Sequence, residues 1–172
     1  MAGKFQVSVD LRDLKEAKKT FDAMGKLPQR IVSAAAAKAA TAVKKAVKNS
    51  EKVPKDSGLL RRAIIRTPEK SRRKGKKVYD IRFDPTWNDE FQVKKRPIKN
   101  PGEFGGKSDH PYYPASMEYG FLTRSKGGGI SYYPGHYFMR DEGEAMRGES
   151  NEIMARTLNE KLEKEWTKQH GT

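Results

Sequence analysis

Cysteine is absent from this chain of 172 residues, and the absence excludes disulfides and thiolate metal sites. Histidine is scarce as well. The three histidines, His110, His136 and His170, do not stand at metal-ligand spacing from one another. We therefore expect neither a metal site nor a bound cofactor.

Long apolar runs are also missing. No stretch of about 18 apolar residues occurs, so the sequence predicts no transmembrane helix. The segment Met1–Phe5 lacks the apolar core of a signal peptide, which predicts a protein that is cytosolic when made. Hydrophobic residues make up 35% of the chain and charged residues 34%. We expect one domain over residues 1–172 with a modest core, part of which depends on a partner for order.

Catalytic signatures are missing too. The chain has no Gly-x-Ser-x-Gly sequence and no cysteine–histidine pair. Lys126–Gly129 is rich in glycine but lacks the remainder of a phosphate-binding loop. Asp141 and Glu142 are adjacent carboxylates at a predicted helix start, where the helix dipole favours acidic residues. These observations predict that the protein is not an enzyme.

Positive charge is what the chain has in excess. Its formal net charge is +14, and residues 44–77 hold fourteen lysines and arginines against three acidic residues. The segment Asp141–Glu165 is net acidic. A basic field attracts polyanions, so nucleic acid, an anionic membrane surface or an acidic protein ring would each fit as a partner. The acidic segment could in turn meet the basic surface of a second copy.

The first part of the chain predicts a strand and two helices. Alternation predicts a strand at Phe5–Val9, and apolar spacing predicts an amphipathic helix at Leu11–Met24 with Asp10 as its N-cap. Pro28 suits the first turn of a second helix, which is rich in alanine and runs to Val47. Its small side chains let another helix or a sheet approach closely, and we expect this close packing within one subunit.

A corner at Pro54–Gly58 ends the alanine-rich helix, because proline cannot continue a helix and glycine supplies positive φ. The β-branched run after it predicts a strand at Leu60–Thr67, and Val78–Phe83 predicts another. The two strands would form a hairpin whose tip, within Pro68–Lys77, is loaded with basic residues.

The second half predicts an arm and a helix. Asp84–His110 has no clear periodicity and is expected to be a long irregular arm that orders against neighbours, with a strand at Glu90–Lys95 as its one regular element. Pro111–Gly120 is aromatic and strand-like towards its end, and a helix is expected over Phe138–Lys168 with an irregularity at Gly148. The predicted fold is α+β: a small antiparallel sheet packed against the alanine-rich helix and the C-terminal helix.

Two groups of basic residues are the candidate surface for contact with nucleic acid or another anionic partner. Spaced lysines and arginines neutralise phosphates without reading bases, and no helix-turn-helix or zinc-finger spacing occurs. Non-sequence-specific nucleic-acid binding is therefore one functional hypothesis. The residues at the corner and hairpin are Arg61, Arg62, Arg66, Arg72, Arg73, Lys74, Lys76 and Lys77, and those in the arm are Lys94, Lys95 and Arg96.

Three short motifs resemble one family, the tail-completion (neck, or head–tail joining) proteins of long-tailed bacteriophages. Pro54–Arg61 resembles the family's Pro-x-Asp-Thr-Gly-x-Leu-Arg, Glu118–Gly120 its Glu-Tyr-Gly, and Tyr137–Arg140 its Pro-Phe-Met-Arg. The order of motifs and elements fits from about Leu27 to Glu165. The matching residues are Pro54, Asp56, Ser57, Gly58, Leu60, Arg61, Glu118, Tyr119, Gly120, Phe138, Met139 and Arg140.

The resemblance implies a structural virion protein. Such a protein would form a ring, expected to hold six copies, between the head-side connector and the tail terminator or tail tube. DNA would pass through its lumen without sequence reading, and no membrane would be involved. The two groups of basic residues would then lie at the DNA channel or at a ring interface. The protein would be located in the neck of the virion, and in the host cytoplasm during assembly.

Overall fold

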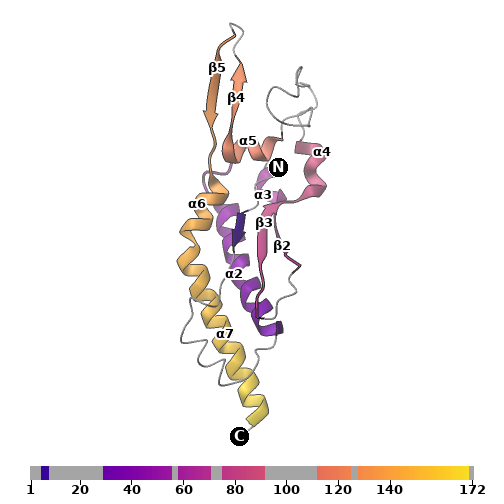
Figure 1. Ribbon diagram of the computed structural model, residues 1–172, viewed down its shortest axis with the longest axis vertical. Coiled ribbons are helices and arrows are strands. Elements are labelled where there is room, and N and C mark those ends of the chain that lie inside the picture. The colour runs from indigo at the N-terminus through magenta and orange to yellow at the C-terminus, as the bar shows by residue number, and fades with distance from the viewer. Residues whose placement is uncertain are drawn as a thin grey trace.

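The computed structural model describes residues 5–7, 29–55, 58–70, 75–91, 112–124 and 128–170. Helices and strands both contribute, and the predicted α+β class is confirmed (Figure 1). The elements are β1 (Phe5–Val7), α2 (Gln29–Asn49), α3 (Leu59–Ala63), β2 (Ile64–Pro68), β3 (Tyr79–Phe83), the 3-10 helix η2 (Pro85–Trp87), α4 (Asn88–Phe91), α5 (Tyr113–Tyr119), β4 (Gly120–Arg124), β5 (Ile130–Pro134), α6 (Phe138–Ala145) and α7 (Arg147–His170). The helix predicted at Leu11–Met24 lies outside the described residues.

Helix α2 begins at Gln29 and packs along α7 (Figure 1). Pro28, expected in its first turn, lies outside the described residues. Ala35 and Ala39, at 0% and 1% exposed, lie in one cluster with Met154 and Leu158 of α7. Alanine allows this close approach because its side chain ends at Cβ. The prediction that the alanines pack within the subunit is therefore confirmed for this face.

The main core lies between the other side of α2 and a three-stranded antiparallel sheet of order β1-β3-β2. The predicted hairpin is confirmed: Ile64 pairs with Phe83, and Pro68 pairs with Tyr79. Ile64 and Ile81 are fully buried in this core, together with Phe138 from the start of α6. The core thus joins the first hairpin to α6.

The strand predicted from Leu60 is wrong over its first half, because Leu59–Ala63 forms the short helix α3. Gly58, with φ of 69°, turns the chain into this helix, and its carbonyl accepts from the N–H of Arg62 at 3.1 Å. Leu60 and Ala63 are both buried. Residues three apart share one face of a helix, so a helical turn buries both where a strand would not.

The arm is helical where it is described. Asp84 caps η2 by accepting from the N–H of Thr86 at 3.0 Å, and Phe91 of α4 is buried in the main core. The prediction of an irregular arm is therefore wrong for residues 85–91, which are helical. The prediction of a strand at Glu90–Lys95 is wrong for its first two residues. The remainder of the arm lies outside the described residues.

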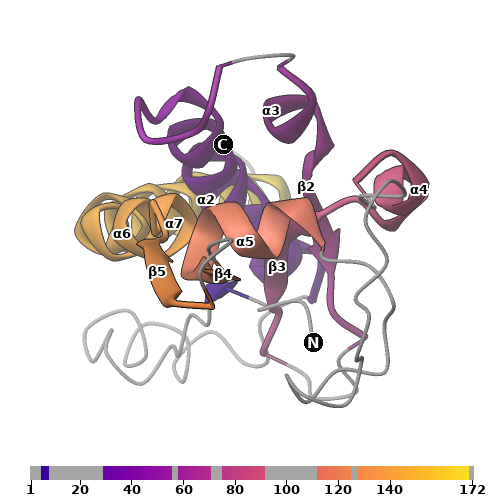
Figure 2. The same cartoon turned by 90° about the horizontal axis from the view of Figure 1, so that it is seen from above.

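The strand expected towards the end of Pro111–Gly120 is wrong, because Tyr113–Tyr119 forms the helix α5 and strand β4 begins only at Gly120. Strands β4 and β5 pair antiparallel into a second hairpin, which projects from one end of the protein (Figures 1 and 2). The C-terminal helix is interrupted as predicted, but the break falls at Met146 rather than at Gly148. Of the described helices, none combines the length and the apolar character that crossing a membrane requires.

Candidate functional site

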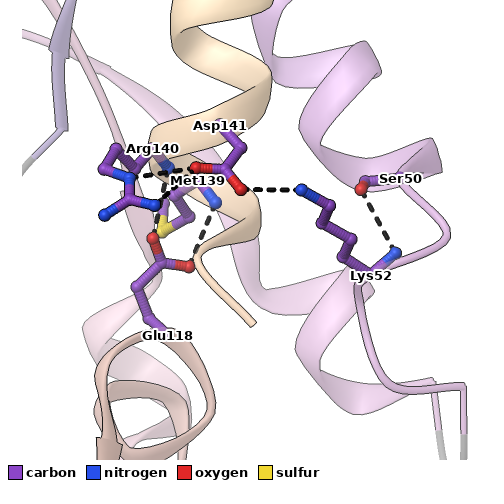
Figure 3. A network of polar contacts seen from close by, with 6 residues as sticks. All are labelled: Ser50, Lys52, Glu118, Met139, Arg140 and Asp141. Carbon is purple, nitrogen blue, oxygen red and sulfur yellow. Dashed lines mark hydrogen bonds and ion pairs between the residues drawn. The ribbon is translucent and has the colours of Figure 1, made fainter. Parts of the chain in front are cut away.

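Glu118 connects two of the three motifs. It lies on α5 and is 2% exposed. Its Oε2 accepts from the N–H of Met139 at 3.0 Å, and its Oε1 accepts from the N–H of Arg140 at 3.1 Å (Figure 3). The first N–H groups of a helix have no partner within the helix, and a carboxylate placed there also meets the positive end of the helix dipole. Glu118 therefore caps α6 from a separate element.

The backbone around this cap is held tightly. The N–H of His136 donates to the carbonyl of Met117 at 2.8 Å, and the N–H of Tyr137 donates to that of Glu118 at 3.0 Å. Tyr137 itself takes a left-handed conformation, with φ of 49°. Bonds from two successive residues fix the direction in which the chain enters α6.

Two glycines cross at the base of the second hairpin. Gly120 has φ of 84°, and a Cβ placed on it would lie 2.3 Å from the carbonyl oxygen of Tyr133. A Cβ on Gly135 would lie 2.2 Å from the carbonyl oxygen of Glu118. Both positions exclude side chains, so the glycine of the Glu-Tyr-Gly motif is needed for the crossing itself.

An ion-pair chain extends the cap to the end of α2. Asp141 accepts from Nε of Arg140 at 2.9 Å and from Nζ of Lys52 at 2.6 Å (Figure 3). The hydrogen bond from Lys52, followed by that from Arg140, lowers the pKa of Asp141 below its usual value of 3.8. The guanidinium of Arg140 also lies 4.1 Å from the centre of the Tyr137 ring.

The motif at Pro54–Arg61 is linked to this ion pair through Ser50. The hydroxyl of Ser50 accepts from the N–H of Lys52 at 3.3 Å, and its carbonyl accepts from a terminal nitrogen of Arg61 at 2.9 Å. Leu60 and Phe138 are buried in the same core. We call this region, through which the three motifs are linked, the motif junction; it is built around Ser50, Lys52, Arg61, Glu118, Arg140 and Asp141.

The motif junction fixes backbone and helix ends rather than presenting a reactive group. Its carboxylates and cations are occupied by one another and by main-chain groups. Within the described ranges, no three histidine, aspartate or glutamate residues gather as a metal site. Of the remaining motif residues, Pro54 is half-buried, Tyr119 is exposed, and Asp56 and Ser57 lie outside the described residues.

Several predicted contact residues face the protein instead of solvent. Arg61 is half-buried, and its Nε is buried without a hydrogen-bond partner. Arg66 donates to the carbonyl of Ala37 and to the hydroxyl of Thr41, and its guanidinium lies 4.7 Å from the centre of the Tyr79 ring. These two arginines hold α3 and β2 against α2.

The tip of the first hairpin is anchored to the start of α2. Gln29 accepts from the N–H of Gly75 at 2.9 Å and donates to the carbonyl of Lys76 at 3.2 Å. Lys77 donates to the carbonyl of Glu69 at 2.8 Å. The side chains of Lys76 and Arg62 are exposed. The other predicted contact residues, Arg72, Arg73, Lys74, Lys94, Lys95 and Arg96, lie outside the described residues.

One exposed apolar surface was not predicted from the sequence. The second hairpin and the residue before it expose large apolar side chains to between 40% and 59%. The available signal was a pair of aromatic and β-branched runs on either side of three glycines, a pattern typical of a hairpin. These side chains are Tyr119, Phe121, Leu122, Ile130, Tyr132 and Tyr133.

The chain matches no family model, and comparison with curated proteins and with solved structures finds no match.

Proposed function

We propose that this protein is a structural subunit of a bacteriophage neck, in which copies form a ring that joins the head connector to the tail. The observation that carries the proposal is the motif junction. Three motifs resemble one family and lie up to 86 positions apart, between Pro54 and Arg140. The second and third are joined by direct hydrogen bonds, and the first is linked to them through Ser50 and Lys52. If the chain shares the fold of this family, its three motifs should contribute to one structural unit, as they do here.

The charge distribution supports the same proposal. The described end of the first hairpin, at Gly75 and Lys76, lies by the start of α2, whereas the apolar second hairpin lies at the opposite end of α2 (Figure 1). A ring placed between two different neighbours needs two different ends. Basic residues near one end would meet passing DNA or an acidic ring, and neither contact requires base reading.

The proposal is tested by assembly without this protein. Infection by a phage that lacks its gene should give DNA-filled heads and separate tails by electron microscopy, because joining is the missing step. Expression of the wild-type chain in the same host should restore joined particles. Normal joined virions without the protein would contradict the proposal.

A second candidate is a protein that binds nucleic acid without sequence preference, favoured by the net charge of +14. In that case the purified chain should bind duplex DNA with an affinity that falls steeply as salt rises, since each phosphate contact releases counterions. Negligible binding even at low salt would remove this candidate and leave the structural role.

A further inference from the structure

The second hairpin lacks the support that a pair of strands needs. Phe121 and Tyr133 stack on one face with ring centres 5.2 Å apart, while Leu122, Ile130 and Tyr132 lie on the other, and every residue of β5 is exposed. An isolated two-stranded hairpin is at best marginally stable in water. Apolar side chains on both faces therefore indicate that something covers it.

The exposed area is large enough for a protein interface. Six large side chains, each roughly half exposed, amount to about 600 Å², if each has about 200 Å² to bury. A standard interface buries about 800 Å² from each partner. The hairpin can thus supply most of one side of such an interface.

Charge points to the surface that fits against it. Between Gly120 and Gly135 the chain carries Arg124 and Lys126 and no acidic residue. Residues 84–90, which we call the acidic lobe, hold Asp84, Asp89 and Glu90 and no basic residue, in a chain with a net charge of +14. The acidic lobe comprises η2 and the start of α4, and its Pro85 and the side chains of Asp89 and Glu90 are exposed.

The hairpin and the acidic lobe are held apart within one subunit by α5. At the start of α5, Phe91 packs on Tyr112 and Tyr113, with ring centres 6.1 and 6.5 Å apart, and this contact anchors the lobe. At the other end α5 runs directly into β4. Its seven residues span about 10 Å, and both views show it between α4 and the hairpin (Figures 1 and 2).

Two different, complementary surfaces on the two sides of one subunit make a head-to-tail contact, which closes into a ring when the rotation allows it. We propose that the β4–β5 hairpin of one copy packs against the acidic lobe of the next copy. The apolar side chains of the hairpin are then covered by the neighbour, and the negative charge of the acidic lobe matches the net positive charge of the hairpin sequence. This inference rests on the proposed function, since it supplies the contact that would build the ring.

The test compares two variants of the full chain by light scattering after size-exclusion chromatography. Leu122→Ser with Ile130→Ser alters the hairpin, and Asp89→Lys with Glu90→Lys reverses the acidic lobe. All four side chains are exposed, so circular dichroism should match the wild type. We expect the wild type to oligomerise. The affinity of self-association should fall by about tenfold or more in each variant, because truncating central contacts and reversing charges both weaken interfaces.

Mixing the two variants separates a head-to-tail contact from other arrangements. Each variant keeps one intact surface, so an equimolar mixture should form a dimer of one copy of each and nothing larger. As a control for charge, Glu152→Lys with Glu163→Lys, both exposed on α7, should leave the oligomer unchanged.

Three results would overturn the inference: a wild type that stays monomeric at its highest soluble concentration, variants that assemble like the wild type, or a mixture that regains the full oligomer. In the second case the neck proposal survives, because a ring would exist through another surface. Joined virions without the gene would reject the neck proposal, and they would leave any self-association found by light scattering intact.

Discussion

At the scale of single residues, the motif junction depends most on Glu118. A buried carboxylate that accepts from two main-chain N–H groups cannot be removed without leaving both donors unpaired. The cost of such a loss exceeds the net gain from making the bonds, because the donors remain shielded from water. The same carboxylate ties α5 to α6, so its effect reaches beyond one helix end.

We predict that Glu118→Ala lowers the free energy of unfolding by about 2–4 kcal/mol, since two hydrogen bonds to a charged group are lost. Glu118→Gln keeps one acceptor and should cost about half as much. Urea unfolding followed by circular dichroism measures both. Glu152→Gln, an exposed change on α7, should stay within about 0.5 kcal/mol of the wild type. A Glu118→Ala variant as stable as this control would show that the cap is dispensable.

Asp141 predicts a dependence of stability on pH. Lys52 and Arg140 lower its pKa in the folded protein, so its contribution to stability is complete above the unfolded value of 3.8 and is lost as the pH falls through the lower folded value. Asp141→Asn should therefore be less stable than the wild type at pH 7, and the difference should shrink below pH 3.8. Unfolding measured across this range tests it, and a difference that is constant with pH would contradict it.

At the scale of elements, local pattern explains what the sequence predicts well. Helix α2 follows from its alanines and from Pro28, and strands β2 and β3 follow from β-branched runs on either side of a polar loop. These segments are long enough for their hydrophobic patterns to be recognised. Helix α3 has only five residues, too few to show a period, and the β-branched residues that follow it suggested a strand.

Helix α5 and the motif junction could not be predicted in the same way. The Glu118 carboxylate finds its partners 21 and 22 positions along the chain, and no local rule connects them. Pro114 in the first turn of α5 and Asp84 before Pro85 are local helix-start signals, so α5 and η2 were partly recognisable. Which motifs touch was decided by packing.

The alanine face of α2 provides a test of element packing. We predict that Ala39→Leu destabilises the protein by about 1–3 kcal/mol, because the larger side chain must push α7 away from α2. Ala42→Leu, on the half-buried side of the same helix, is the matched control and should cost less. Thermal unfolding of the two variants makes the comparison, and equal stability would argue against close packing at Ala39.

The two hairpin glycines provide a second test. Gly120 and Gly128 both have φ of 84°, but only at Gly120 would a Cβ meet other atoms, within 2.3 Å. Gly128→Ala should cost about 1 kcal/mol through backbone strain alone. Gly120→Ala should cost about 3 kcal/mol or more, because it adds a clash with the opposite strand. Similar losses of stability for the two variants would show that the crossing can relax.

At the scale of the whole molecule, the protein is elongated, with the end of α7 at one end and the second hairpin at the other (Figure 1). The first hairpin is tied at Gly75 to the start of α2, on the side towards the end of α7. The net charge of +14 opposes self-association unless local surfaces overcome it. An assembly that depends on contacts at one end and on charge at the other should respond differently to changes at the two ends.

We predict that replacing Arg72, Arg73, Lys74, Lys76 and Lys77 together with serine leaves folding intact and impairs head–tail joining or DNA retention. The expected reason is loss of contact with DNA or with an acidic ring, since the change removes five positive charges from one loop. Phage yield and particle morphology after complementation with this variant measure the effect. Wild-type yield would count against a role for the tip.

The glycine crossing has a mechanical consequence. Gly120 and Gly135 leave no side chain between the strands at the point where the hairpin leaves the body, so main chain rests on main chain there. The five-residue strands reach about 16 Å beyond this point, at about 3.3 Å per residue. If the hairpin pivots at this crossing, a tilt of about 10° would move the far end of its strands by about 3 Å. Glu118, which caps α6, lies two positions before Gly120, so a shift at the cap would be magnified at the far end of the strands, where the proposed contact with a neighbouring subunit lies.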